Sequence, residues 1–174
     1  FTSAPIAIFE TLDLVSTEHW RVYLPILVLS IIPIFPLIRW AERSGRTRGV
    51  FRCAVIGLAG AMLIAAMGHG VALALLAALL LFFVAFNYLE GALPSMISRR
   101  APSSARGAAL GAYASSQFLG AFAGGALGGT AQMLWGLTGA FAVCAALPII
   151  WLLIPPAAAP TSEVEASAAS TPST

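Results

Sequence analysis

The sequence contains no lysine and very little charge of either sign. Only 9% of its 174 residues are charged, all nine basic residues are arginine, and 59% of the residues are hydrophobic, with a mean hydropathy of +0.91. An average soluble domain carries about a quarter charged residues. A chain this apolar cannot cover its own surface with polar groups, so we expect its solvent to be lipid.

Cysteine and histidine are also scarce, which argues against most catalytic and metal chemistry. Cys53 and Cys144 lie in apolar segments without CxxC spacing and are interpreted as small buried hydrophobic residues. Two histidines and few acids cannot form a typical metal cluster. The HExxH, GxSxG and P-loop patterns are missing as well. We therefore predict that the protein is not an enzyme and binds neither a metal nor a cofactor.

Long hydrophobic runs dominate what is present, and runs of about 20 apolar residues are typical of membrane helices. We expect a half-length run at 1–14, followed by full spans at about 22–39, 50–68, 71–97, 107–134 and 137–155. Because the chain begins with Phe1 inside an apolar run, without a signal-peptide pattern, we expect a fragment. Residues 156–174, rich in Ala, Ser, Thr and Pro, predict a disordered tail.

The arginines define an orientation. Eight of the nine lie in two connections, 39–52 and 98–106, which the positive-inside rule places in the cytoplasm together with the tail. This topology explains the basic clusters without a nucleic-acid partner. The partial first helix and the five spans make six passes, which we read as two triplets of opposite topology, a known transporter plan. The predicted fold is an all-α integral membrane bundle of six helices with a 3+3 inverted repeat.

The connection between the first two full spans reads RWAERSGRTRGVF and is a short polar turn with Gly45 at its bend. We expect Glu42 to pair with an arginine of the same turn, Arg39, Arg43 or Arg46. Two interpretations stay open. The turn is either a plain positive-inside loop or a latch that holds one conformation through ion pairs.

Glu90 is an acidic residue placed well inside a full span, about 9 Å on the cytoplasmic side of the midplane at 1.5 Å per residue. Ionisable residues in a membrane helix are costly and mark functional sites by default. Asn87 shares the face of Glu90, and Tyr113 and Gln117 lie at a comparable depth on the next span, which predicts a polar layer. Three roles stay open for Glu90: a hydrogen-bond anchor, a proton-coupling carboxylate or a substrate contact.

Glycines recur at four-residue spacing in the fourth full span. Gly107 and Gly111 form one stripe, and Gly120, Gly124 and Gly128 form another on roughly the opposite face. Small residues let neighbouring membrane helices approach closely, so two stripes predict two close neighbours. The stripes serve packing alone, or they also form a smooth face that slides or bends during a conformational change.

Several of these motifs together resemble the major facilitator superfamily. RWAERSGRTRGVF is similar to the cytoplasmic loop after its second and eighth helices, with Glu42 at the acidic position and Gly45 at the turn glycine. Ile38 and Trp40 replace the leading Gly and Leu of that pattern. NYLEGALPSMISRRAP and the following ARGAALGAYASSQFLGAFAGGALGG resemble the tenth helix, the turn and the eleventh helix of efflux members.

The resemblance covers about residues 5–155 and implies the C-terminal half of a twelve-helix transporter, helices 7 to 12 with the first one truncated. It implies a bacterial inner membrane location, and as partners the bilayer, the missing N-terminal six-helix half and a small-molecule substrate. Drug or sugar efflux by proton antiport and alternating access are what the subgroup implies. The alternative is a non-transporting half-length scaffold, or a degraded remnant, that packs as a homodimer.

Overall fold

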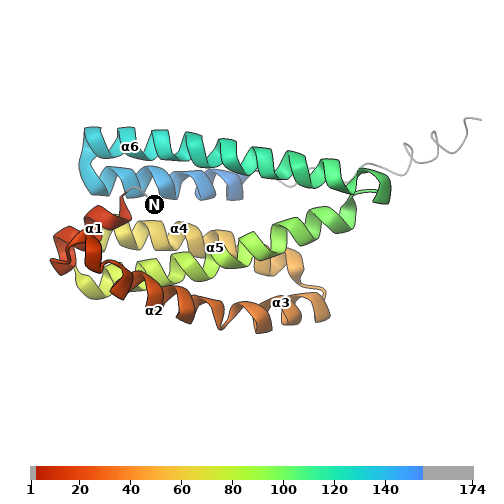
Figure 1. Cartoon of the computed structure of the whole chain (residues 1–174), viewed down its shortest axis with the longest axis horizontal. Coiled ribbons are helices and arrows are strands. Elements are labelled where there is room, and N and C mark those ends of the chain that lie inside the picture. Colours follow the sequence, from red (N-terminus) through yellow and green to blue (C-terminus); the bar gives the residue numbers. More distant parts are fainter. Residues whose placement is uncertain (1–2, 155–174) are drawn as a thin grey trace, which may run out of the picture.

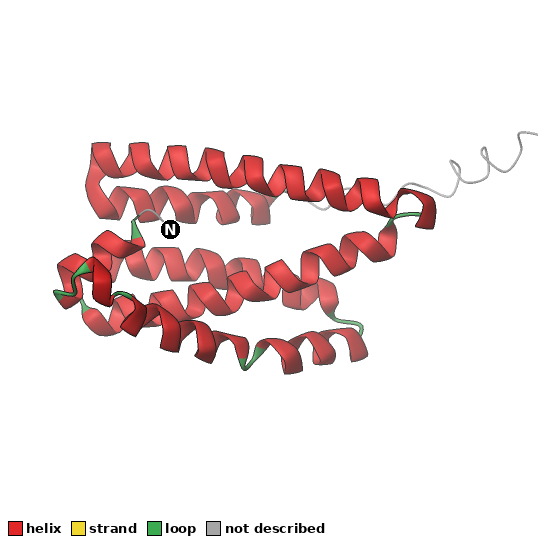
Figure 2. Ribbon diagram, viewed as in Figure 1, coloured by secondary structure: helices red, strands yellow, loops and turns green. Residues whose placement is uncertain are grey.

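The computed structural model describes residues 3–154, and all regular structure in that range is helical (Figures 1 and 2). The elements are α1 (Ala4–Leu12), η1 (Ser16–Glu18), α2 (Trp20–Ile31), α3 (Ile34–Arg43), α4 (Thr47–Gly68), α5 (Ala72–Arg100), η2 (Ser103–Ala105) and α6 (Arg106–Leu153). The all-α prediction is confirmed for these residues. Phe1 and the predicted tail, residues 156–174, lie outside them.

The first full span is made of two helices, α2 and α3. The break falls at Ile32 and Pro33, because a proline has no N–H to donate and interrupts the backbone hydrogen-bond ladder. Together, Trp20–Arg43 is 24 residues long with a hydropathy of 2.1, enough to cross a membrane. This segment includes the span predicted at 22–39 and bends at Pro33.

The second and third predicted spans are α4, with 22 residues, and α5, with 29 residues. Small residues bring the two helices together, since a Cβ on Gly57 would lie 3.6 Å from the Cβ of Ala85. At the turn that joins them, a Cβ on Gly68 would lie only 2.8 Å from the Cβ of Ala74. Glycine at position 68 therefore permits the tight reversal from α4 to α5.

α6 folds back on itself at Gly136, where φ is 67° and ψ is −164°. That backbone region is essentially open to glycine alone. Figure 1 shows the two arms of α6 lying alongside each other, and we call them the first arm (106–135) and the second arm (137–153). The reversal falls between the spans predicted at 107–134 and 137–155. α6 is therefore two helices joined at Gly136. A single straight helix of its 48 residues would be roughly 72 Å long at 1.5 Å per residue.

The second arm packs along α4, as two pairs of rings show. The ring centroids of Phe51 and Trp151 are 5.5 Å apart, and those of His69 and Phe141 are 6.3 Å apart. Because the early residue of α4 meets the late residue of the arm, the two helices are antiparallel. The first arm starts beside the end of α5, to which the short η2 turn connects it, and the two helices diverge away from that turn (Figure 1).

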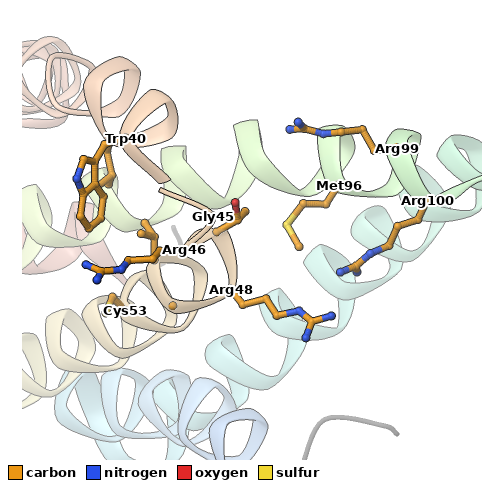
Figure 3. Close-up of a pocket in the computed structure, with 12 residues that line it drawn as sticks. Trp40, Gly45, Arg46, Arg48, Cys53, Met96, Arg99 and Arg100 are labelled. Carbon is orange, nitrogen blue, oxygen red and sulfur yellow. The ribbon is translucent and has the colours of Figure 1, made fainter. Parts of the chain in front are cut away.

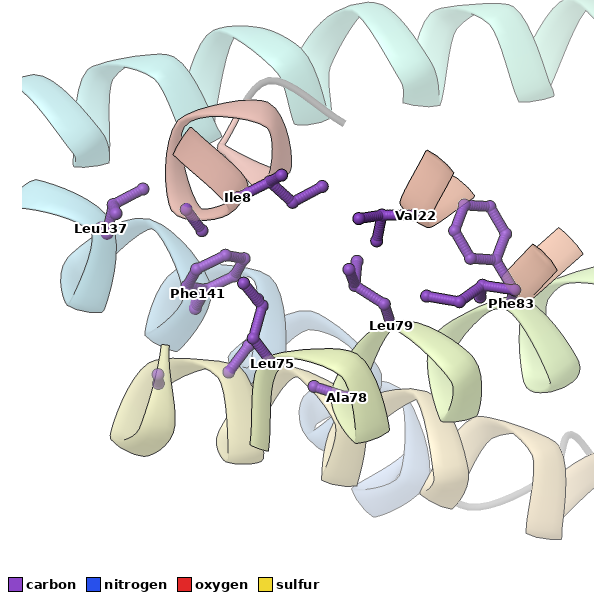
Figure 4. Packing of buried hydrophobic residues seen from close by; sticks show 12 residues of the cluster. Ile8, Val22, Leu75, Ala78, Leu79, Phe83, Leu137 and Phe141 are labelled. Carbon is purple, nitrogen blue, oxygen red and sulfur yellow. The ribbon is translucent and has the colours of Figure 1, made fainter. Parts of the chain in front are cut away.

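The arginine-rich turns 39–52 and 98–106 gather at one end of the bundle, which we call the basic end (Figure 1). The main apolar core lies at the opposite end, where it joins α1, α2, α4, α5 and the second arm (Figure 4). It contains Ala7, Ile8, Val22, Ile26, Ala65, Ala66, Leu75, Ala78, Leu79, Phe83, Leu137 and Phe141. A smaller cluster of Ala41, Val50, Tyr88 and Ala92 supports the basic end.

The predicted six-helix 3+3 bundle is not confirmed. Residues 3–154 contain four segments long and apolar enough to cross a membrane, the fourth of which, Ser103–Leu153, includes the reversal at Gly136. α1 has nine residues, about half of what a membrane span needs. Large apolar side chains such as Phe118 and Phe122 stay exposed along these segments, as expected of surfaces that meet lipid or another helix.

Candidate functional site

Glu90 and Gln117 are joined by a hydrogen bond between α5 and the first arm of α6. The Gln117 amide donates from Nε2 to Oε1 of Glu90 over 2.6 Å. The two helices run antiparallel on either side of the η2 turn, which brings residues 27 positions apart to the same level. Glu90 is half-buried and Gln117 is exposed, so the pair lies at an open face of the chain.

Asn87 turns to a different partner. Its Nδ2 donates to Oγ of Ser30 on α2 over 2.9 Å, and the Ser30 hydroxyl donates to the carbonyl of Leu27 over 2.8 Å. Ser30 is completely buried. The predicted layer is thus divided over two faces of α5, with Asn87 bound to α2 and Glu90 bound to α6. Tyr113 lies one turn from Gln117 on the first arm and is half-buried.

Sequence reasoning did not single out Ser30, although a signal was present. It is the one serine in the run VYLPILVLSIIPIFPLI, and a hydroxyl in a membrane helix needs a partner. The hydroxyl donates within its own helix to Leu27, and its oxygen accepts from Asn87 on α5. The pair holds the last turn of α2 against the middle of α5.

The turn after α3 has the predicted bend but a different ion pair. Gly45 has a φ of 65°, which favours glycine. Glu42 pairs with Arg99 near the end of α5, and not with Arg39, Arg43 or Arg46 of its own turn as expected. The reason is tertiary packing. α3 packs on α5, and this places Glu42 at the end of α3 beside Arg99 at the end of α5.

The Glu42–Arg99 pair ties the two arginine-rich turns together. Arg99 also donates to Oγ of Ser95 over 2.7 Å, which orients the guanidinium group along α5. Both members of the ion pair are about half-exposed, at 42% and 58% of their side-chain surface. Solvent therefore limits the strength of this contact, and a latch role for it stays a prediction.

Beside this pair, the basic end is hollowed by an open cleft of about 940 Å³ (Figure 3). Its walls are the end of α3, the turn after it, the start of α4 and the end of α5. The lining residues are Leu37, Trp40, Gly45, Arg46, Thr47, Arg48, Gly49, Val50, Cys53, Met96, Arg99 and Arg100. Arg39 and Arg43 instead line a smaller neighbouring hollow with Pro36, Trp40 and Ser44.

The glycine stripes of the first arm face open space within the described chain. A Cβ on any of four predicted packing glycines, Gly107, Gly111, Gly120 and Gly124, would meet nothing within 4 Å. Gly128, near the reversal, is buried. Close helix neighbours for the stripes stay a prediction, and residues 3–154 supply none at those four positions.

At the end opposite the basic end, polar contacts join the helices to one another. His69 Nε2 lies 3.1 Å from Oγ1 of Thr138, which joins the end of α4 to the second arm. The Thr11 hydroxyl donates to the carbonyl oxygen of His69, which adds α1. Oγ of Ser3 donates to Oε1 of Gln132 over 2.8 Å. Together with the main core, these bonds make this end the better packed one.

Long apolar helices that leave much of their surface exposed, joined by a few polar pairs, define an α-helical integral membrane protein. The sequence matches the Major Facilitator Superfamily over residues 3–173, and the chain belongs to this superfamily of transporters. Such transporters are generally not enzymes, which agrees with the missing catalytic motifs.

Two curated relatives carry transporter names. The chain is 35% identical over 139 residues to the "Inner membrane transport protein YajR" of Escherichia coli K12, a match that covers 80% of this chain and 31% of the relative. It is 29% identical over 116 residues to the "Uncharacterized transporter BU466" of Buchnera aphidicola, covering 67% and 30%. The chain thus spans about a third of the length of these relatives.

Proposed function

We propose that the chain is the C-terminal half of a secondary transporter that moves a small molecule across the cytoplasmic membrane by alternating access. In this mechanism the bundle rocks against a second bundle around a site between them. The observation that carries the proposal is the Glu90–Gln117 pair. It sets a carboxylate and an amide at membrane depth on an open face of the bundle.

A polar pair in that position needs protein or water around it, because an ionisable group facing lipid is costly. The flank of the pair points to protein. Phe118 and Phe122, 74% and 76% exposed on the same arm, suit lipid and protein alike. Gly120 and Gly124, which have no neighbour within the described chain, suit the close approach of another helix. An N-terminal six-helix half would cover this face and complete a substrate cavity around Glu90.

We further propose that transport is efflux of a drug-like molecule or a sugar, driven by proton antiport, with Glu90 as the group that takes up the proton. A carboxylate with a single amide donor can be protonated without breaking a buried ion pair. The pair also lies in the half of α5 nearer the basic end, which is the cytoplasmic side under the positive-inside rule.

The test replaces Glu90 by Gln in the full-length transporter. We expect net efflux driven by a pH gradient to fall at least tenfold in this variant, while exchange of substrate without a pH gradient continues. Efflux would be followed in proteoliposomes over a range of pH, with a substrate first found by thermal stabilisation against a compound panel. Glu18→Gln is the matched control, because Glu18 is an exposed acid paired with Arg21 at the other end. Unchanged pH dependence in Glu90→Gln would refute proton coupling through this residue.

The alternative, a half-length scaffold or remnant, has less support because both relatives are named as transporters and this chain matches less than a third of the length of each. The coding sequence upstream of Phe1 separates the two proposals. An in-frame continuation with six further spans supports the transporter half. A start codon directly before Phe1 supports a half-length protein that packs as a homodimer.

A further inference from the structure

The cleft at the basic end carries positive charge that the described chain does not neutralise. The side chains of Arg46, Arg48 and Arg100 make no ion pair or hydrogen bond within residues 3–154. Glu42, the acid of the adjoining turn, is engaged by Arg99. The cleft therefore presents three guanidinium groups without a counter-charge.

Two of these groups converge on one space. Figure 3 shows Arg48, from the start of α4, and Arg100, from the end of α5, extending toward each other with Met96 beside them. Like charges directed at one point repel each other, and an anion placed between them turns the repulsion into attraction. Guanidinium groups suit phosphate in particular, because their fixed donors match its oxygens.

Much of the remaining lining is apolar, which restricts the kind of anion. Leu37, Trp40, Val50, Cys53 and Met96 contribute to the same walls. A small soluble anion needs no such surface, whereas a lipid has acyl chains that do. Trp40 ends the first span and is half-exposed, a common position for tryptophan at the level of the lipid headgroups.

We propose that this cleft is a binding site for an anionic phospholipid of the cytoplasmic leaflet, with the lipid phosphate held by Arg48 and Arg100. One acyl chain of the lipid runs from the phosphate past Met96 toward Trp40 on the other side of the cleft (Figure 3). The cytoplasmic leaflet is where anionic lipids and basic pockets between membrane helices meet. This proposal does not depend on which substrate the protein moves, or on whether it moves one.

Native mass spectrometry of the full-length protein with added phosphatidylglycerol tests the proposal. We expect retention of phosphatidylglycerol over phosphatidylethanolamine, and a roughly tenfold weaker retention in Arg48→Gln/Arg100→Gln. Arg39→Gln/Arg43→Gln is the matched control, since it removes the same charge from the same end but from the neighbouring hollow. We expect it to change retention less than twofold.

Two results would overturn the proposal. Equal loss in both double variants would mean that the basic end attracts anionic lipid only through its total charge. Displacement of phosphatidylglycerol by millimolar glycerol phosphate or inorganic phosphate would mean that the site takes a soluble phosphate and not a lipid.

A second measurement needs no change in the arginines and so covers the case of variants that fail to fold. The fluorescence of Trp40 is obtained as the difference between the wild type and Trp40→Phe. We expect brominated phosphatidylglycerol to quench it at least twice as strongly as brominated phosphatidylcholine at the same lipid fraction, because the lipid that fills the cleft lies against this ring. Equal quenching by the two lipids contradicts a selective site.

Discussion

Two interhelical hydrogen bonds place polar groups among otherwise apolar helices, and they differ in exposure. The bond between Ser30 and Asn87 is sealed between α2 and α5, with Ser30 fully buried. The bond between Glu90 and Gln117 lies on an open face. A sealed bond contributes to stability, whereas an open polar pair remains available to a substrate, a proton or another helix.

Replacing Ser30 by Ala tests the sealed bond. The Asn87 amide would lose its acceptor in an apolar environment, and we expect the free energy of unfolding to fall by about 1 kcal/mol. Thermal unfolding in detergent would measure it. Ser116→Ala is the control, because the Ser116 hydroxyl is exposed and bonds only to the carbonyl of Ala112 in its own helix. Equal effects of the two variants would contradict a special role for Ser30.

The reversal in α6 depends on a single glycine. Gly136→Ala forces a side chain into a backbone region that only glycine readily adopts, and we expect a destabilisation of about 1–3 kcal/mol. Gly125→Ala is the control, because Gly125 has ordinary helical backbone and open space around its Cβ position. There, alanine stabilises the helix by up to about 1 kcal/mol. Both variants would be compared by thermal unfolding, and a neutral Gly136→Ala would contradict the reversal.

The Glu42–Arg99 contact links α3 to α5 and is the element-scale candidate for the latch. In the full-length transporter, we expect Glu42→Arg or Arg99→Glu alone to lower transport several-fold, and the double charge reversal to restore most of it. The free energy of unfolding should change little, since exposed ion pairs contribute about 0.2–1 kcal/mol to it. Transport in proteoliposomes and unfolding in detergent separate the two effects.

The exposed Glu18–Arg21 pair, with an N–O distance of 3.0 Å, provides the control for the latch. It lies in one local stretch of chain, so its reversal should leave transport unchanged. If reversing Glu42 and Arg99 together fails to recover transport, the contact is not a latch, and the turn is a plain positive-inside loop.

At the scale of the whole molecule, the open face of the first arm predicts that a second helical bundle packs against it in the full-length transporter. In the full-length transporter, Gly124→Leu would block the close approach of a partner helix, and we expect at least a tenfold loss of transport at normal expression. Leu127→Trp on the same arm is the control, since a large and half-exposed apolar residue already occupies that position. Full activity of Gly124→Leu would mean that this face meets lipid.

Much of the architecture follows from the sequence, because membrane spans are read from the length of apolar runs. The positions of the turns at Gly45, Gly68 and Gly136 agree with the structure to within a few residues. The half-span at 1–14 appears only as the short α1. The triplet repeat could not be derived, because small and apolar residues repeat in every span and leave no register to compare.

The sequence by itself determined that the chain is a membrane protein, roughly where its long apolar helices lie, and that Glu90 is an exceptional residue. Hydrophobic length and the cost of charge in lipid are local properties, so they need no tertiary information. Only the tertiary structure decided that Glu42 pairs with Arg99, that Asn87 pairs with Ser30, and that Arg48 and Arg100 face one cleft. Each of these depends on the rotation of one helix against another, and a nearly uniform apolar sequence does not fix that rotation.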